Sequence, residues 1–293
     1  MLRIGLFLMT NLAVVIVAGI VLNLMGGYFD PQGNLNLQPL LVMCAIIGFG
    51  GSFISLLLSK FMAKRAMRVQ IIDRARNADE QWLISTVEDL SRRAGIKTPE
   101  IGVFPAEEAN AFATGWNRND ALVAVSLGLL HRFERDEVRA VLAHEIGHVA
   151  NGDMVTLTLI QGVVNTFVMF FARIIGHFVD RVLLKNERGH GIGFIAATIV
   201  AELVLGFLAS MIVMAFSRYR EFRADAAGAH LADRDSMIRA LRRLQVESGR
   251  TADSSLADGM KAFGISGGFR HQLGRLFASH PPLDERIRVL QRG

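Results

Sequence analysis

The sequence predicts a mainly α-helical polytopic membrane protein with four apolar helices, joined to a cytoplasmic α+β domain that carries a small antiparallel sheet. Hydrophobic residues make up 51% of the 293-residue chain, and the mean hydropathy is +0.34. These values are too apolar for an ordinary soluble domain of this length. The apolar residues gather in four blocks, each close to the roughly 20 residues that a helix needs to cross a bilayer.

The four apolar blocks are residues 4–25, 40–58, 155–178 and 192–216. The first block is longer than the apolar core of a secretion signal, and a second block follows it at once. We therefore expect an uncleaved membrane anchor. The blocks divide the chain into an anchor with two helices at 1–59, a first cytoplasmic part at 60–153, a helical hairpin at 154–216 and a second cytoplasmic part at 217–293. The single Cys44 excludes an intrachain disulfide.

The distribution of basic residues predicts how these helices are oriented across the membrane. The connection at 26–39 has no Lys or Arg, whereas six basic residues lie between positions 60 and 76. Because Lys and Arg concentrate on the cytoplasmic side, the long middle segment is predicted to be cytoplasmic. The connection at 180–191 also carries basic residues, although alternation places it outside. Either the rule is weak there, or the last two helices form a hairpin that never fully crosses the bilayer.

The chain has a formal net charge of +5. No stripe of Lys or Arg is interleaved with aromatic residues, so this charge favours contact with an anionic lipid bilayer over nucleic-acid binding. Nothing in the sequence predicts the oligomeric state.

The first cytoplasmic part contains a predicted helix at 79–93, where apolar residues recur at helical spacing and Gly95 suits the helix C-terminus. Three short segments rich in β-forming residues follow at 100–105, 110–115 and 121–126. A turn at 117–120 separates the last two. We expect these segments to form a small antiparallel sheet before the next helix.

A zinc-binding motif, His144-Glu145-Ile146-Gly147-His148, lies in that next helix. Residues four apart share one helical face, so both imidazoles reach one Zn²⁺, while Glu145 is directed toward a water on the metal. Gly147 costs about 1 kcal/mol relative to Ala in a helix and indicates a close approach to the backbone. The alternative is two histidines that only pack in a core.

Zinc needs a third protein ligand, for which Glu221 is our candidate. Its neighbour Asp225 lies one helical turn later and is expected to accept the second ring N–H of a ligating His. Asp153 is too near His148 along the same helix, so we expect it to point elsewhere. In the alternative interpretation, Glu221 and Asp225 pair with neighbouring arginines as a solvated charge cluster.

The apolar hairpin explains how distant residues meet. His148 lies seven residues before the third block, and Glu221 lies five residues after the fourth. Two antiparallel helices therefore return Glu221 to the side that the chain left at His148.

Four motifs together carry a family resemblance. They are the run Asn110-Ala111-Phe112-Ala113-Thr114-Gly115, the zinc motif through Asp153, the run Glu-Phe-Arg-Ala-Asp at 221–225, and the run Ser-His-Pro-Pro-Leu at 279–283. With the four-helix layout, they make the chain resemble the bacterial membrane-bound zinc metalloproteases of the heat-shock HtpX type, peptidase family M48. The resemblance covers nearly the whole chain.

The resemblance implies a zincin-like fold of the gluzincin kind and the activity of a zinc metalloendopeptidase. It implies one Zn²⁺ per chain, held by His144, His148 and Glu221, with Glu145 as the catalytic carboxylate. It also implies a multi-pass protein of the bacterial inner membrane, with its active site on the cytoplasmic side. The expected partners are misfolded or damaged membrane proteins, cleaved as substrates in stress-linked quality control.

The residues also predict a mechanism. Three ligands leave one position on zinc for water, and Glu145 takes the proton of that water as it attacks a peptide carbonyl. The developing oxyanion needs a second donor, for which His280 is the candidate. Alternatively, His280 only shapes the entry into the helix that follows Pro281 and Pro282.

The segment formed by Asn110, Ala111, Phe112 and Ala113 is the predicted substrate-binding strand. If it is an open sheet edge, an extended peptide adds to it through backbone hydrogen bonds, which makes recognition tolerant of sequence. In the alternative, these residues are simply sheet core.

Glu202 is an unusual residue inside the fourth apolar block. By helical rise it lies roughly as far from Glu221 as Asn165 lies from His148, whereas Arg173 is about 10 Å deeper. We therefore expect Glu202 to pair with Asn165 or Gln161 and to hold the hairpin together.

Two other classes of function compete with the protease. One is a zinc-bound membrane module that captures misfolded chains without cutting them, and the other is a transporter or sensor with a structural metal. Neither alternative requires a carboxylate at Glu145.

Overall fold

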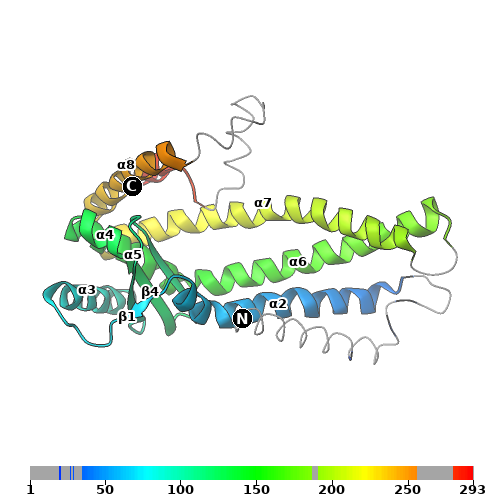
Figure 1. Cartoon of the computed structure of the whole chain (residues 1–293), viewed down its shortest axis with the longest axis horizontal. Helices are drawn as coiled ribbons and strands as arrows, with labels where there is room; N and C mark the ends of the chain where they lie inside the picture. Colours follow the sequence, from blue (N-terminus) through cyan, green and yellow to red (C-terminus); the bar gives the residue numbers. More distant parts are fainter. Residues whose placement is uncertain are drawn as a thin grey trace. The chain divides into compact units, whose positions relative to one another are not determined.

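The computed structural model describes residues 35–186, 191–255 and 280–292, together with residues 20, 27 and 29. The first apolar block, at 4–25, lies almost wholly outside this part of the chain. The structure divides into two compact units (Figure 1). We call residues 1–55 with 157–213 the helical unit, and residues 56–156 with 214–293 the sheet unit.

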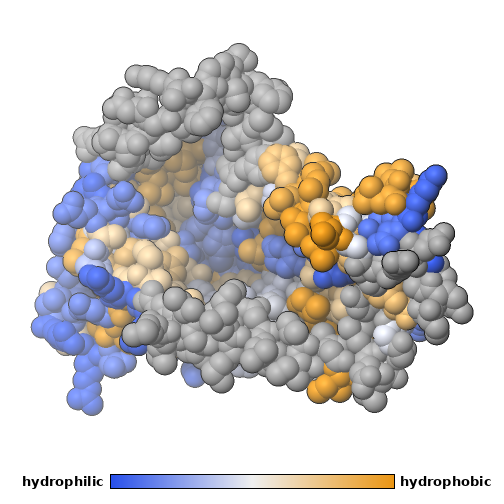
Figure 2. Space-filling model, turned by 45° about the vertical axis from the view of Figure 1, so that its right-hand side comes forward, coloured by the Kyte–Doolittle hydropathy of each residue, from blue (hydrophilic) through white to orange (hydrophobic). Residues whose placement is uncertain are grey.

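Three long helices belong wholly or partly to the helical unit. They are α2 (Leu37–Ala66), α6 (Asp153–Phe178) and α7 (Ile192–Leu231), and a short π-helix, η1 (Val179–Leu183), follows α6. Within the described residues, α2, the α6–η1 segment and α7 are long and apolar enough to cross a membrane. Exposed apolar side chains such as Phe171 and Leu203 occur along these helices. Figure 2 shows hydrophobic surface at the right of the view. This surface suits contact with lipid.

Small residues allow α2 and α6 to pack closely. A Cβ atom added at Gly48 would lie 2.8 Å from the backbone nitrogen of Thr166, which is closer than real Cβ contacts. Beside this point, Leu40, Met43 and Cys44 form a buried cluster with side chains of α6. Close backbone approach at small residues is a common way for helices to associate in membranes.

The expected partner of Glu202 is wrong. Glu202 Oε1 lies 3.0 Å from Arg173 Nη1, while Gln161 donates a hydrogen bond to Asn165. The depth count from His148 assumed one continuous helix, but α6 starts anew at Asp153. Counted from there, Arg173 lies roughly 30 Å along α6, close to the roughly 28 Å that separates Glu202 from Glu221 along α7.

The sheet unit contains a four-stranded sheet in the order β1-β2-β4-β3. The strands are β1 (Gln70–Ile71), β2 (Glu100–Phe104), β3 (Ala111–Asn117) and β4 (Asp120–Ser126). β3 and β4 form the antiparallel hairpin that the sequence predicts, and β3 lies at the sheet edge.

The expectation of a purely antiparallel sheet is wrong, because β2 and β4 pair in parallel. The reason lies in β4, whose residues 121–126 are all buried. A strand that is buried on both faces takes a central position, which places β4 between β2 and β3. The sheet is therefore mixed.

Helices pack against this sheet around one core. They are α3 (Ala78–Ala94), α4 (Leu127–Arg132), α5 (Arg135–Asn151), α8 (Arg234–Ser255) and α10 (Leu283–Arg292). α3 ends at Gly95, which adopts a left-handed conformation with φ 67°. Buried residues of α3, β4 and α5, among them Leu90, Val123 and Leu142, form the centre of the core. This core surrounds the buried face of α5 and positions the helix.

Candidate metal centre

Helix α5 carries the first two candidate ligands. A capping box between Glu134 and Glu137 starts the helix, and Gly152 ends it with φ 67°. His144 and His148 therefore lie on one face of a regular helix, with their Nε2 atoms 3.2 Å apart. Their ring planes are nearly perpendicular, at 89°. Both Nε2 atoms can face a common point.

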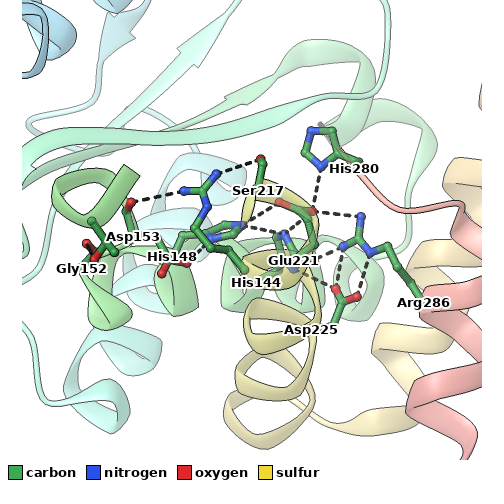
Figure 3. Close-up of polar contacts among 11 residues, drawn as sticks. His144, His148, Gly152, Asp153, Ser217, Glu221, Asp225, His280 and Arg286 are labelled. Atoms are coloured by element: carbon green, nitrogen blue, oxygen red, sulfur yellow. Dashed lines mark hydrogen bonds and ion pairs between the residues drawn. The ribbon is translucent and has the colours of Figure 1, made fainter. Parts of the chain in front are cut away.

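Helix α7 brings the third candidate to that point (Figure 3). Glu221 Oε1 lies 3.3 Å from His148 Nε2, and Glu221 Oε2 lies 3.6 Å from His144 Nε2. Glu221 is only 2% exposed. The three residues form a group that could hold a metal ion.

The donor geometry fits zinc. Ligand atoms about 2.0–2.1 Å from a tetrahedral Zn²⁺ lie about 3.3 Å from one another. The two Nε2 atoms lie 3.2 Å apart, and each lies 3.3 or 3.6 Å from one of the two Glu221 oxygens, which is close to that value. Two imidazole nitrogens and one carboxylate oxygen are also a donor set typical of catalytic zinc, which keeps a fourth position open.

Carboxylates orient both imidazoles from behind. Asp225, one turn after Glu221 on α7, places Oδ1 2.9 Å from His144 Nδ1, where the sequence pattern predicted a carboxylate. Asp153 Oδ2 lies 2.7 Å from His148 Nδ1. Each contact holds the ring so that Nε2 faces the metal position.

The expectation that Asp153 points elsewhere is wrong. Counting five residues along one helix overlooked Gly152, whose left-handed conformation ends α5 and redirects the chain. Asp153 then begins α6 and turns its side chain back toward His148. The Gly between Asn151 and Asp153 was the available signal, since Gly commonly follows the last helical residue.

Arg286 is a buried member of the site that sequence reasoning missed. Its Nε and Nη2 atoms donate to the two oxygens of Asp225 at 2.7 and 2.5 Å, and Nη1 lies 3.3 Å from Glu221 Oε2. Arg286 belongs to α10, far from the zinc motif in sequence. The available signal was its position four residues before Leu290, which places a charge on the buried face of this helix.

His280 also reaches the centre. Its Nδ1 atom lies 2.7 Å from Glu221 Oε2, although the side chain is 65% exposed. The rest of the imidazole therefore faces away from the protein interior.

The segment 110–113 divides into two parts. Asn110 and Ala111 line a cavity of about 390 Å³ together with His144, Glu145 and Glu221. Phe112 instead packs against Phe104, with ring centroids 5.5 Å apart, and Ala113 packs against the core. The structure thus brings only the start of the predicted substrate strand to the candidate metal centre.

The charges around the two histidines favour their protonated forms in the metal-free protein. Burial opposes the charge, but hydrogen bonds with Asp153 and Glu221 and the nearby Glu145 raise the pKa of His148 to about 9. Burial is likewise outweighed at His144, where Asp225 and Glu221 raise the pKa of the imidazole. A positive charge is therefore favoured at this point, and a bound metal ion would supply it in place of the two protons.

Two histidines and a glutamate that could hold a metal ion, with Glu145 beside them in the same cavity, are the arrangement of a metallopeptidase. Residues 77–292 match the model of peptidase family M48, so the chain belongs to this family. The apolar helices and the relatives below make it a membrane metalloprotease.

The chain is similar over its whole length to proteins named Protease HtpX. It is 71% identical to the one from Cellvibrio japonicus over 292 residues, which is 99% of this chain and 98% of that protein. It is 66% identical to one from Pseudomonas putida over 295 residues, 100% of this chain and 99% of that protein. The fold also resembles the crystal structure of S. mikatae Ste24p, with a TM-score of 0.62, 20% identity and coverage of 99% of this chain and 67% of that one.

Proposed function

We propose that the protein is a zinc-dependent endopeptidase that hydrolyses peptide bonds of misfolded or damaged membrane proteins. The observation that carries this proposal is the convergence of His144, His148 and Glu221 at zinc-like separations, beside Glu145 in one cavity. Membership of family M48 and the names of the relatives support it. One Zn²⁺ per chain fits the three donors.

Each side chain has a role in the proposed reaction. When bound, zinc lowers the pKa of water toward about 7 and polarises the substrate carbonyl. Glu145 accepts the proton of the attacking water and returns it to the leaving amine. His280 donates a hydrogen bond to the developing oxyanion, a contact whose loss typically costs about 10²–10³ in rate. Asp225 and Asp153 orient the two histidines.

Substrate binds along the sheet edge in this proposal. β3 is the edge strand, and Asn110 and Ala111 lie at its start on the wall of the cavity. An extended peptide that pairs with this edge uses its backbone, so recognition tolerates many sequences. Such tolerance suits an enzyme that removes unfolded chains.

We further propose that the protein is a multi-pass protein of the bacterial inner membrane, with the metal centre on the cytoplasmic side. The six basic residues between positions 60 and 76 support this orientation. The long apolar helices support the membrane location.

Replacing Glu145 with Gln tests the mechanism. The full-length protein is purified in detergent, loaded with zinc, and incubated with an unfolded protein and with a destabilised membrane protein. We expect cleavage by Glu145→Gln to fall about 10²–10⁴-fold, because Gln cannot accept the proton. Zinc content, measured by atomic absorption, should stay the same. Equal cleavage by both forms would exclude Glu145 as the base, and binding without cleavage by wild type would favour a non-hydrolytic capture module.

A further inference from the structure

The turn between β3 and β4 is exposed and takes no part in the proposed chemistry. Asn117 pairs with Asp120 across the hairpin, which leaves Arg118 and Asn119 as a two-residue turn. Both turn residues are exposed, and Arg118 has no ion pair with any other residue that the structure describes. We call residues 116–120 the hairpin tip.

Trp116 is the large apolar residue of the hairpin tip. The pairing of the strands is irregular between Gly115 and Asn117, and a Cβ atom added at Gly115, where φ is 152°, would lie 2.7 Å from Ala121 Cα. A bulge of this kind redirects the neighbouring side chain. Trp116 is 44% exposed, and its Nε1 atom donates to Asp120 Oδ2 at 2.6 Å. Because the polar atom of the ring has a protein partner, the ring can leave water without losing that hydrogen bond.

An ion-pair network joins the hairpin tip to helix α2 at the point where the apolar block of the helix ends. The block ends at residue 58, and Lys60 follows about 3 Å further along the helix. Lys60 Nζ lies 2.8 Å from Glu100 Oε1 and also pairs with Asp120 Oδ1. These residues all belong to the sheet unit. The hairpin tip therefore lies at the level where α2 would leave the hydrocarbon layer of a membrane.

The exposed apolar surface of α2 continues just past Lys60. Phe61 and Met62 are both exposed, and Arg65 Cζ lies 6.0 Å from the centroid of the Phe61 ring. Aromatic and basic side chains at the end of an apolar helix are typical of the headgroup zone of a bilayer. Trp116 adds an amphipathic ring at the same level.

The charge that remains at the hairpin tip is positive. In the ion-pair network, Lys60 and Lys64 face two carboxylates, so these four charges cancel. Arg118 carries a further positive charge, and Lys97 adds another close enough to attract Asp120. Arg118 and Lys97 are both exposed. Anionic headgroups attract such basic side chains at a membrane surface.

We propose that the hairpin tip is a lipid-contacting surface, in which the Trp116 ring enters the headgroup zone of the bilayer that α2 crosses and Arg118 binds anionic phospholipid. The inference rests on the proposed membrane location and not on proteolysis. It places one end of β3 at the lipid surface, while Asn110 and Ala111 near the other end line the cavity of the candidate metal centre. The edge strand then spans the roughly 20 Å between the lipid surface and this cavity.

The two tryptophans of the chain make this contact measurable. Trp82→Phe leaves Trp116 as the fluorescent residue, and Trp116→Phe leaves Trp82, which packs against the core with Arg135 over its ring. Each full-length protein is reconstituted into nanodiscs of phosphatidylcholine and phosphatidylglycerol. Its emission is then quenched by lipids that carry a nitroxide at the headgroup or at the end of the acyl chain. Headgroup nitroxide should quench Trp116 at least about three-fold more than chain-end nitroxide does, and at least about three-fold more than it quenches Trp82.

A check on folding accompanies these variants. The difference between wild type and Trp116→Phe gives the Trp116 signal a second time, without any change at Trp82. Zinc content should equal that of wild type, because neither tryptophan lines the cavity of the candidate metal centre.

Replacing Arg118 tests the preference for anionic lipid. In the Trp82→Phe protein, adding phosphatidylglycerol to phosphatidylcholine nanodiscs should lower the quenching of Trp116 by aqueous acrylamide about two-fold. Arg118→Glu in the same background should abolish this response, because the new carboxylate repels the headgroups. Arg288→Glu is the matched control, since Arg288 is an exposed residue of α10, and it should keep the full response.

The outcomes separate this inference from the proposed function. Strong acrylamide quenching of Trp116 without headgroup quenching would place the hairpin tip in water, and strongest quenching from the chain end would place the ring in hydrocarbon. Protection from acrylamide and from both lipids would show that a second copy of the chain covers the tip. Each of these results overturns the proposal, as does an Arg118→Glu protein with an unchanged response, and each leaves proteolysis in place. If wild type does not insert into nanodiscs, the proposed membrane location fails and this inference fails with it.

Discussion

At the residue scale, the centre of the site is the buried carboxylate of Glu221, which several basic side chains contact. Glu221 Oε2 lies within 3.6 Å of His144 Nε2, 2.7 Å of His280 Nδ1 and 3.3 Å of Arg286 Nη1. Asp225, one turn away, pairs with Arg286 on both oxygens. Two acidic side chains are thus buried together, and Arg286 supplies the permanent positive charge between them.

Removing Arg286 should destabilise the sheet unit. Arg286→Met leaves Asp225 and Glu221 buried without their cation, and breaking a buried pair from one side typically costs about 3–5 kcal/mol. Denaturant unfolding of the metal-free protein, followed by tryptophan fluorescence, measures this loss, because the chain's Trp residues, Trp82 and Trp116, both belong to the sheet unit. Arg288→Met is the control, since Arg288 is an exposed residue of the same helix. Equal effects of both variants would contradict the role of Arg286.

The stability of the metal-free protein should fall at alkaline pH. Although burial opposes it, hydrogen bonding to Asp153 and Glu221 raises the pKa of His148 to about 9 from an ordinary value of 6.5. The resulting stabilisation, roughly 3 kcal/mol, is fully present below pH 6.5 and is lost as pH rises through 9. Thermal unfolding between pH 6 and 10 measures it. Asp153→Asn should flatten this dependence, and an unchanged profile in that variant would count against His148 as its source.

At the element scale, close packing between α5 and α7 positions the metal ligands. A Cβ atom added at Gly147 would lie 2.9 Å from Ala227 Cβ, and one added at Gly228 would lie 3.2 Å from the backbone nitrogen of His144. Each helix thus presents a glycine to the other. The sequence suggested such an approach at Gly147, and the structure identifies α7 as the partner.

Enlarging Gly147 should weaken metal binding. Gly147→Ala favours the helix intrinsically by about 1 kcal/mol, but the added methyl group pushes α7 from α5 and separates Glu221 from the histidines. We expect zinc affinity to fall about 10-fold, the size typical when ligand orientation is disturbed. Competition with a chromogenic chelator measures this affinity. Gly51→Ala is the control, because nothing lies within 4 Å of a Cβ added there; equal zinc affinity in all three proteins would contradict the prediction.

At the scale of the whole molecule, the candidate metal centre and the ion pair between Arg173 and Glu202 belong to different units. All candidate ligands lie in the sheet unit. The Arg173 and Glu202 ion pair lies in the helical unit and links α6 to α7. We therefore interpret this pair as a support for the helical hairpin, with no part in proteolysis.

Neutralising Glu202 tests this separation. Glu202→Gln leaves Arg173 without its partner in the apolar unit, which should lower the midpoint of thermal unfolding in detergent. The double variant Arg173→Met with Glu202→Gln should recover part of that loss. Cleavage per folded, zinc-loaded molecule should stay within about two-fold of wild type. Loss of activity in a folded, zinc-loaded Glu202→Gln protein would contradict a purely structural role.

Much of the fold follows from local patterns. The three apolar blocks within the described residues, the three longer strands and the zinc-motif helix are each recognisable from a few consecutive residues, because hydrophobic periodicity and turn residues act locally. The order of the strands in the sheet could not be predicted from such local patterns. It depends on the burial of β4 on both faces, which packing in the tertiary structure determines.

By itself, the sequence determined which residues make up the candidate metal centre: two histidines at helical spacing, a carboxylate between them, and a distant glutamate with an aspartate one turn later. Only the tertiary structure decided which groups surround them. Contacts between separate helices account for Arg286 and for the pairing of Arg173 with Glu202. A change of chain direction at Gly152 accounts for Asp153. The physical reason is the sequence separation of the residues involved. Spacing along one helix depends on neighbouring residues, whereas contacts between helices depend on packing throughout the core.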